Sequence, residues 1–265
     1  NLAAAANLAA AADAVDRHPA IAERLGVDER EAATWREAAA NVHIPYDEQL
    51  KVHPQSAHFT DLPEWDFDRN THYPLLLHAP YFDLYRRQVI KQADLVLAML
   101  WYSDRFSPED KARNVDYYER RTVRDSSLSA CIQAVLAAEV GHLELAHDYT
   151  YEAAVIDLQD LHNNTGDGLH IASLAGAWIA LVSGFGGLRV CSGELVLDPA
   201  LPAGINRLCF GLRWQGMRLT VEVRPDQVTY SLRDGEHASM RLRHAGEQLT
   251  VSVGEPVTRR LTPRK

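Results

Sequence analysis

The first 189 residues place their hydrophobic positions with the spacing of helices. Ser107-Pro108 marks a helix start, a capping serine before a proline at the first helical position, and Gly141 marks a helix end. The pattern predicts about seven helices, of which we place six at residues 2–15, 28–42, 83–102, 108–121, 130–140 and 142–161. Because their connections are short, we expect successive helices to be neighbours in space.

From about Val190 onward, the hydrophobic period changes to two residues. Short strands separated by turn-forming residues at this spacing are typical of an antiparallel sandwich. The chain is therefore predicted to be mainly α with a smaller all-β domain, divided into residues 1–189 and 190–265. The clearest alternation lies at residues 208–212, 219–223, 228–232 and 249–253.

Residues 162–189 predict a further helix of unusual composition. Turn-forming residues precede it, small residues such as Gly176 run along it, and Gly184, Gly186 and Gly187 mark its end. Small residues allow close approach of another backbone, and a helix start suits an anion because its N–H groups are unpaired. His170 on the first turn makes this a candidate anion site. The alternative is a tightly packed core helix with a hydrogen-bonded histidine.

Two other groups of polar residues stand out. Lys91 and Gln92 interrupt an apolar run and therefore need partners, either a buried salt bridge or sugar hydroxyls. Ser126, Ser127 and Ser129 stand at a helix start beside Arg124, although ordinary capping needs only one or two of the serines. Both groups are therefore candidates for ligand binding.

The composition excludes several classes of protein. The net charge of -9 argues against a general binder of nucleic acid or of an anionic membrane. The three cysteines form no CxxC pair, which makes a zinc site or a disulfide framework unexpected and favours a reducing compartment. We find neither a membrane-spanning apolar run nor a signal peptide, so we expect a cytoplasmic protein. The alanine-rich start resembles a helix already under way in a longer chain.

Three stretches together resemble the inverting disaccharide phosphorylases and hydrolases of glycoside hydrolase family 65, which includes maltose, trehalose and kojibiose phosphorylases. They are YRRQVIKQADLVLAM at 85–99, RDSSLSACIQAVLAAEVG at 124–141 and DGLHIASLAGAWIALVSGFGGLR at 167–189. The resemblance implies that residues 1–189 are the later part of an (α/α)6 toroid. Residues 190–265 would then be the C-terminal antiparallel β-sandwich.

The resemblance also implies roles for individual residues. Lys91 and Gln92 match positions that bind the transferred glucosyl unit, Ser126 and Ser127 match the phosphate loop, and His170 matches a phosphate contact. Arg124 stands where many relatives carry histidine. The implied reaction is phosphorolysis of an α-glucosyl disaccharide with inversion, giving β-glucose 1-phosphate. It needs no metal or organic cofactor, because inorganic phosphate is the co-substrate and the nucleophile.

The family also uses a general-acid glutamate, which the resemblance places upstream of Asn1. We therefore expect no catalytic residue in this chain and no activity from these residues alone. The expected partner is the N-terminal part of the same protein, and we also expect a homodimer. A hydrolase of the same family is an alternative, but it needs a carboxylate base to activate water. Asp125 is the carboxylate beside the serines, and we interpret it as a helix cap rather than a base. A non-catalytic carbohydrate-binding or structural fragment is the other alternative.

Overall fold

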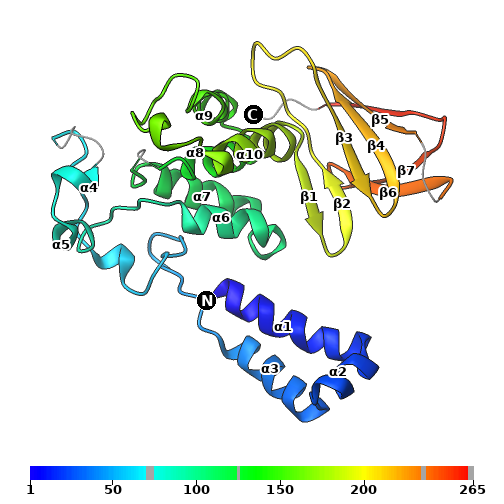
Figure 1. Ribbon diagram of the computed structural model, residues 1–265, viewed down its shortest axis with the longest axis horizontal. Helices are drawn as coiled ribbons and strands as arrows, with labels where there is room; N and C mark the ends of the chain where they lie inside the picture. Colours follow the sequence, from blue (N-terminus) through cyan, green and yellow to red (C-terminus); the bar gives the residue numbers. More distant parts are fainter. Residues whose placement is uncertain (70–74, 124–125, 234–236, 262–265) are drawn as a thin grey trace. The chain divides into compact units, whose positions relative to one another are not determined.

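The computed structural model describes residues 1–69, 75–123, 126–233 and 237–261. The chain divides into two compact units, Asn1–Thr60 and Asp61–Lys265 (Figure 1). The smaller unit contains α1 (Leu2–Arg17), α2 (Pro19–Leu25) and α3 (Glu29–Asn41). Asp28 caps the start of α3, since its Oδ1 accepts a hydrogen bond of 2.8 Å from the Glu31 N–H. Helices α1 and α3 are antiparallel, with Ala12 and Ala32 buried.

The larger unit begins with a series of helices and ends with eight strands among its described residues. Helix α7 starts as predicted: Pro108 is at its first position, and Ser107 and Asp110 form a reciprocal capping box. The last helix, α10, continues directly into a π-helix, η4. The helices are α4 (Leu75–His78), α5 (Tyr81–Leu84), α6 (Asp94–Trp101), α7 (Pro108–Glu119), α8 (Ser129–Glu139), α9 (Leu143–Val155), α10 (Ile171–Ile179) and η4 (Ala180–Phe185).

The predicted helix over residues 83–102 is wrong in its first part, because only Asp94–Trp101 forms a substantial helix there. The backbone of Ile90 bonds instead to a distant segment, accepting from Val123 N at 2.7 Å and donating to Arg121 O at 2.9 Å. The buried side chain of Gln88 accepts from the Tyr117 hydroxyl at 2.6 Å. These long-range hydrogen bonds replace the helical ones that the local sequence favours.

Helices α6, α8 and α10 begin at the same end of the larger unit. A Cβ on Gly176 of α10 would lie 2.6 Å from the Cys131 Cβ, whereas one on Gly184 of η4 would lie 3.5 Å from the Val135 Cα. Since the contact points advance in the same direction along both helices, α8 and α10 are parallel. The start of α6 joins them through a hydrogen bond of 3.2 Å from Ser129 Oγ to Lys91 O. The close backbone approach predicted for the glycine-rich helix is confirmed.

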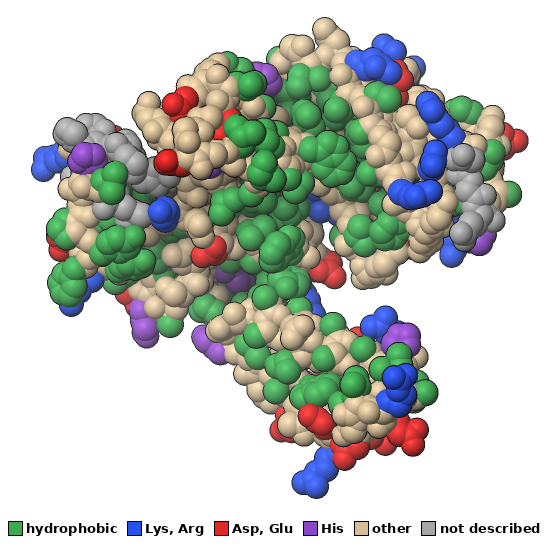
Figure 2. Space-filling view, viewed as in Figure 1, with side chains coloured by type: hydrophobic (Ala, Val, Ile, Leu, Met, Phe, Trp, Pro, Cys, Tyr) green, Lys and Arg blue, Asp and Glu red, His purple; other side chains and the backbone are tan. Residues whose placement is uncertain are grey.

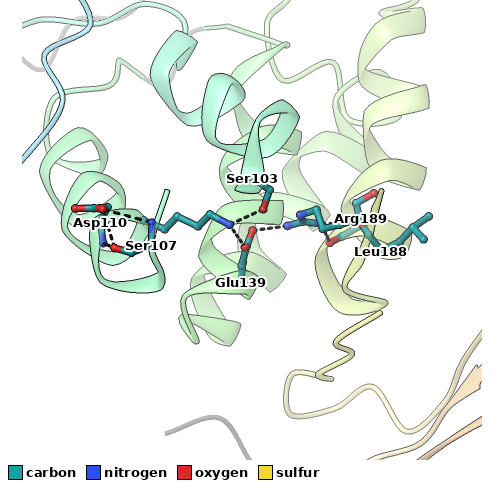
Figure 3. Close-up of polar contacts among 8 residues, drawn as sticks. Ser103, Ser107, Asp110, Glu139, Leu188 and Arg189 are labelled. Atoms are coloured by element: carbon teal, nitrogen blue, oxygen red, sulfur yellow. Dashed lines mark hydrogen bonds and ion pairs between the residues drawn. The ribbon is translucent and has the colours of Figure 1, made fainter. Parts of the chain in front are cut away.

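An ion-pair cluster joins these helices at their opposite end (Figure 3). Glu139, the last residue of α8, accepts hydrogen bonds from Lys111 Nζ at 2.6 Å and from Arg189 Nη2 at 2.5 Å. Lys111 also donates to Ser103 Oγ at 2.5 Å, just beyond α6. Burial opposes ionisation of Glu139, but Arg189 and Lys111 outweigh it and lower the pKa of its carboxyl. The cluster therefore ties the end of α8 to the segments that follow α6 and η4.

The strands form two four-stranded sheets that enclose a shared hydrophobic core (Figure 1). The four strands expected from alternation are confirmed, and the other four, which are short or less regular, were missed. All pairings between these strands are antiparallel except that of β2 with β6. One sheet has the order β1 (Leu188–Cys191), β2 (Glu194–Leu197), β6 (Ser239–His244), β7 (Glu247–Ser252), and the other has β3 (Leu208–Trp214), β4 (Met217–Val223), β5 (Gln227–Leu232), β8 (Val257–Arg260).

Hydrophobic side chains also gather on the outside of the larger unit, over its helices (Figure 2). On α10, Ile171, Leu174 and Trp178 are exposed at spacings of three and four residues. Such an apolar stripe is the part of a helix that ordinarily packs against a neighbour. Among the described residues, no helix is both long enough and apolar enough to span a membrane.

Candidate active site

The loop before α6 exposes the first pair of predicted site residues. Lys91 and Gln92 follow the Ile90 bridge, and the Gln92 carbonyl accepts from Asp94 N at 2.8 Å. Both side chains are exposed, and neither forms an ion pair or side-chain hydrogen bond within the described part of the chain. The backbone of this loop is therefore fixed by its neighbours, while the Lys91 ammonium and the Gln92 amide can bind a ligand. The buried salt bridge considered for them is absent from the described contacts.

The serine loop at the start of α8 lies directly against the Lys91 loop. Ser129 is buried and its hydroxyl bonds to Lys91 O, whereas Ser126 and Ser127 are half-buried. Ser126 O accepts from Ser129 N at 3.2 Å, which closes the turn before the helix. Of the three serines, Ser129 is therefore structural, and Ser127 makes no described side-chain hydrogen bond. Arg124 and Asp125 lie outside the described residues.

His170 precedes α10, and a carboxylate that the sequence analysis missed holds its ring. The His170 Nδ1 lies 2.6 Å from Asp157 Oδ1, and the His170 backbone N–H donates to Asp157 Oδ2 at 2.8 Å. The side chain of Asp157 is only 6% exposed. The hydrogen bond from the His170 side chain is the main cause that lowers the pKa of Asp157. The imidazole is thus fixed in orientation, with Nε2 on the side away from the carboxylate.

The segment that carries Asp157 also ends α9 earlier than predicted, at Val155 rather than near Leu161. Asp160 Oδ1 accepts hydrogen bonds from the backbone N–H groups of Asn164 and Thr165 and from the Thr165 hydroxyl. Aspartates that satisfy backbone donors favour turns over helix. The sequence offered one signal for this contact, namely acidic residues shortly before the helix start that carries His170. That signal does not show which of these carboxylates bonds to the imidazole ring.

The structure therefore brings the predicted residues to one end of three parallel helices. Ser129 links the Lys91 loop to the serine loop, and the parallel packing of α8 and α10 places His170 at the same end. Helix starts carry partial positive charge and unpaired N–H groups, which favour an anion. Lys91 adds a formal cation. Among the described residues, no group of three or more His, Cys, Asp or Glu side chains is placed to hold a metal ion.

Comparison with known protein families supports the sequence-based resemblance. Residues 1–179 match the glycosyl hydrolase family 65 central catalytic domain, and residues 188–251 match the C-terminal domain of that family. The chain belongs to glycosyl hydrolase family 65. The resemblance drawn from the three sequence stretches is therefore confirmed, together with the helical part and the β domain that it implied.

Individual family 65 relatives include uncharacterised and named enzymes. An uncharacterised glycosyl hydrolase of Mycobacterium leprae is 63% identical over 100% of this chain and 34% of its own length. The α,α-trehalose phosphorylase of Geobacillus stearothermophilus is 40% identical over 82% of this chain and 29% of its own. A solved structure, a putative kojibiose phosphorylase from the human microbiome, is 28% identical with a TM-score of 0.82, covering 92% of this chain and 36% of that one. The chain thus spans about a third of these relatives.

Proposed function

We propose that this chain forms the phosphate-binding side, and part of the glucosyl-binding side, of the active site of an inverting disaccharide phosphorylase. The observation that carries the proposal is the gathering of Lys91, Ser126, Ser127 and His170 at three parallel helix starts. Relatives named trehalose and kojibiose phosphorylases, at 40% and 37% identity, support it. The substrate would be an α-glucosyl disaccharide of the maltose, trehalose or kojibiose type.

In the proposed reaction, inorganic phosphate attacks the anomeric carbon of the bound glucosyl unit. A phosphate oxygen forms the new bond to this carbon while the glycosidic C–O bond breaks, and a general acid supplied from outside this chain protonates the departing oxygen. The serine hydroxyls, the helix starts and His170 would hold the phosphate oxygens in line for attack. Lys91 and Gln92 would bind the glucosyl hydroxyls. The product is β-glucose 1-phosphate.

A hydrolase of the same family would need a carboxylate to activate water where phosphate is proposed to bind. Asp157 is the carboxylate in contact with His170, but both of its oxygens already accept hydrogen bonds from His170. Asp157 is therefore poorly placed to act as that base.

The test uses the complete gene product that contains these 265 residues. It would be incubated with trehalose, kojibiose and maltose, with and without inorganic phosphate, while glucose 1-phosphate and free glucose are assayed. Phosphate-dependent glucose 1-phosphate is the expected result. Equal release of free glucose with and without phosphate would make the protein a hydrolase, and no reaction with any sugar would favour a binding or structural role.

A further inference from the structure

The parallel pairing of β2 with β6 leaves an opening in the β domain. The two strands are paired only at Val196 with Arg243 and at Leu197 with His244, at the end of each strand. Their first halves are not paired with each other, and residues of both strands line a cavity of about 470 Å³ there. We call this cavity the β2–β6 notch. Its volume falls within the range of roughly 300–1,000 Å³ that is usual for small-molecule sites.

One wall of the β2–β6 notch is aromatic. Trp214, the last residue of β3, is half-buried and lines the cavity from the opposite sheet. The chain reverses directly after it through Gln215 and Gly216, both with positive φ. This tight turn fixes the end of β3, and the Trp214 side chain packs against the shared core while it lines the notch, so little side-chain entropy is lost when a ligand binds beside it.

The rim of the notch carries polar side chains that have no described partner. Arg241 and Thr250 face each other across β6 and β7, and Gln248 lies two residues along β7. All three are exposed, and none has a side-chain hydrogen bond or ion pair within the described part of the chain. Glu194 differs, because Arg243 Nη2 donates to its carboxylate at 2.5 Å. The rim thus offers unused hydrogen-bonding groups and no described unpaired carboxylate.

We propose that the β2–β6 notch binds a saccharide, with a pyranose ring against Trp214 and its hydroxyls bonded by Arg241, Gln248 and Thr250. A pyranose combines an apolar C–H face with a rim of hydroxyl donors and acceptors, and the notch combines an indole with both kinds of partner. A purely apolar ligand would leave the rim unused. The notch lies on β2, β3, β6 and β7, whereas the candidate active site lies at the starts of α6, α8 and α10.

The test measures binding of maltotriose to the complete gene product that contains these 265 residues, by titration calorimetry. Replacing both rim side chains in the variant R241A/Q248A should weaken binding by about tenfold or more, since each lost hydrogen bond contributes about 0.5–1.5 kcal/mol. Both side chains are exposed, so the fold should persist, which thermal unfolding would verify. Trp214→Phe should retain more binding than Trp214→Leu, because only phenylalanine keeps an aromatic face.

Two control variants separate this site from others. Arg260→Ala removes an exposed arginine on β8, outside the notch, and should leave the affinity unchanged. Lys91→Ala removes a proposed glucosyl contact of the candidate active site, so any maltotriose binding that remains in this variant and is lost in R241A/Q248A comes from the notch. The proposal is overturned if maltotriose does not bind, if Lys91→Ala abolishes binding while R241A/Q248A does not, or if inorganic phosphate displaces maltotriose from the notch. Any of these results leaves the proposed phosphorolysis open to its own test.

Discussion

The hydroxyl of Ser129 donates a hydrogen bond of 3.2 Å to the backbone oxygen of Lys91 and so fastens two loops that are 38 residues apart. Ser129→Ala should leave this carbonyl without its partner and destabilise the protein by about 1 kcal/mol. Ser127→Ala is the matched control, since the Ser127 hydroxyl has no described structural bond. Urea unfolding would measure both, and equal stability of the two variants would contradict the structural role of Ser129.

The Asp157–His170 pair predicts a pH dependence of stability. The pKa of Asp157 is below its ordinary value of 3.8 in the folded protein, so its ionised form stabilises the fold above that value. This contribution is lost as the pH falls through the lowered folded-state pKa. The difference in unfolding free energy between wild type and Asp157→Asn should therefore shrink between about pH 5 and about pH 3. A difference that stays constant over this range would show that the carboxylate charge contributes nothing.

Asp157→Asn should also impair the use of phosphate in the complete gene product. The asparagine amide keeps only one acceptor oxygen for the two His170 donors, the backbone N–H and the ring Nδ1–H, so the ring is no longer held in one orientation and tautomer. We expect a raised KM for phosphate with a smaller change in the KM for the disaccharide. Asp160→Asn is the control, since Asp160 holds the turn at Thr165 rather than bonding to the His170 side chain.

The two halves of the candidate active site should be separable by mutation. In the complete gene product, His170→Ala should lower kcat/KM for phosphate by about tenfold to a hundredfold, because hydrogen bonds to charged groups contribute about 1.5–3 kcal/mol. Lys91→Ala should instead affect the disaccharide more than phosphate. Initial rates with each substrate varied in turn would measure both effects. Equal losses for both substrates in both variants would mean that the two binding functions are not divided in this way.

Glu139 should be among the most important charged residues for stability. Glu139→Gln leaves Lys111 and Arg189, whose side chains are 8% and 9% exposed, without their carboxylate. Breaking a buried ion pair in this way costs about 3–5 kcal/mol. Glu194→Gln breaks the exposed pair with Arg243 and should cost about 0–1 kcal/mol. Similar denaturation midpoints for the two variants would rule out the role assigned to the cluster.

Two glycines of the α10–η4 helix should respond differently to alanine. A Cβ at Gly176 would meet the Cys131 Cβ and Sγ at 2.6 Å, so Gly176→Ala should destabilise by about 1–3 kcal/mol through overpacking. A Cβ at Gly184 would have 3.5 Å to its nearest neighbour, an ordinary contact. Gly184→Ala should therefore be tolerated. Thermal unfolding of both variants checks the contrast, and loss of stability in Gly184→Ala alone would contradict the packing described.

The sequence alone was sufficient for features that depend on neighbouring residues. Ser107 is the cap of α7 that the sequence predicted, and alternation located strands such as β4 because side chains in a strand face opposite sides in turn. The three family stretches also identified the fold. For the cap and the strands, the determining interactions lie within a few residues, so the spacing of residue types reveals them directly.

Only the tertiary structure decided how distant residues meet. Local preference predicted one helix over 83–102, but hydrogen bonds of Gln88 and Ile90 to remote segments end it. His170 was expected at a helix start, whereas its partner Asp157 depended on how the turn after α9 folds back. The gathering of Lys91, Ser126 and His170 rests on the parallel packing of α8 and α10, made possible where Gly176 meets Cys131. Such pairings join residues far apart in the chain, so no local period encodes them.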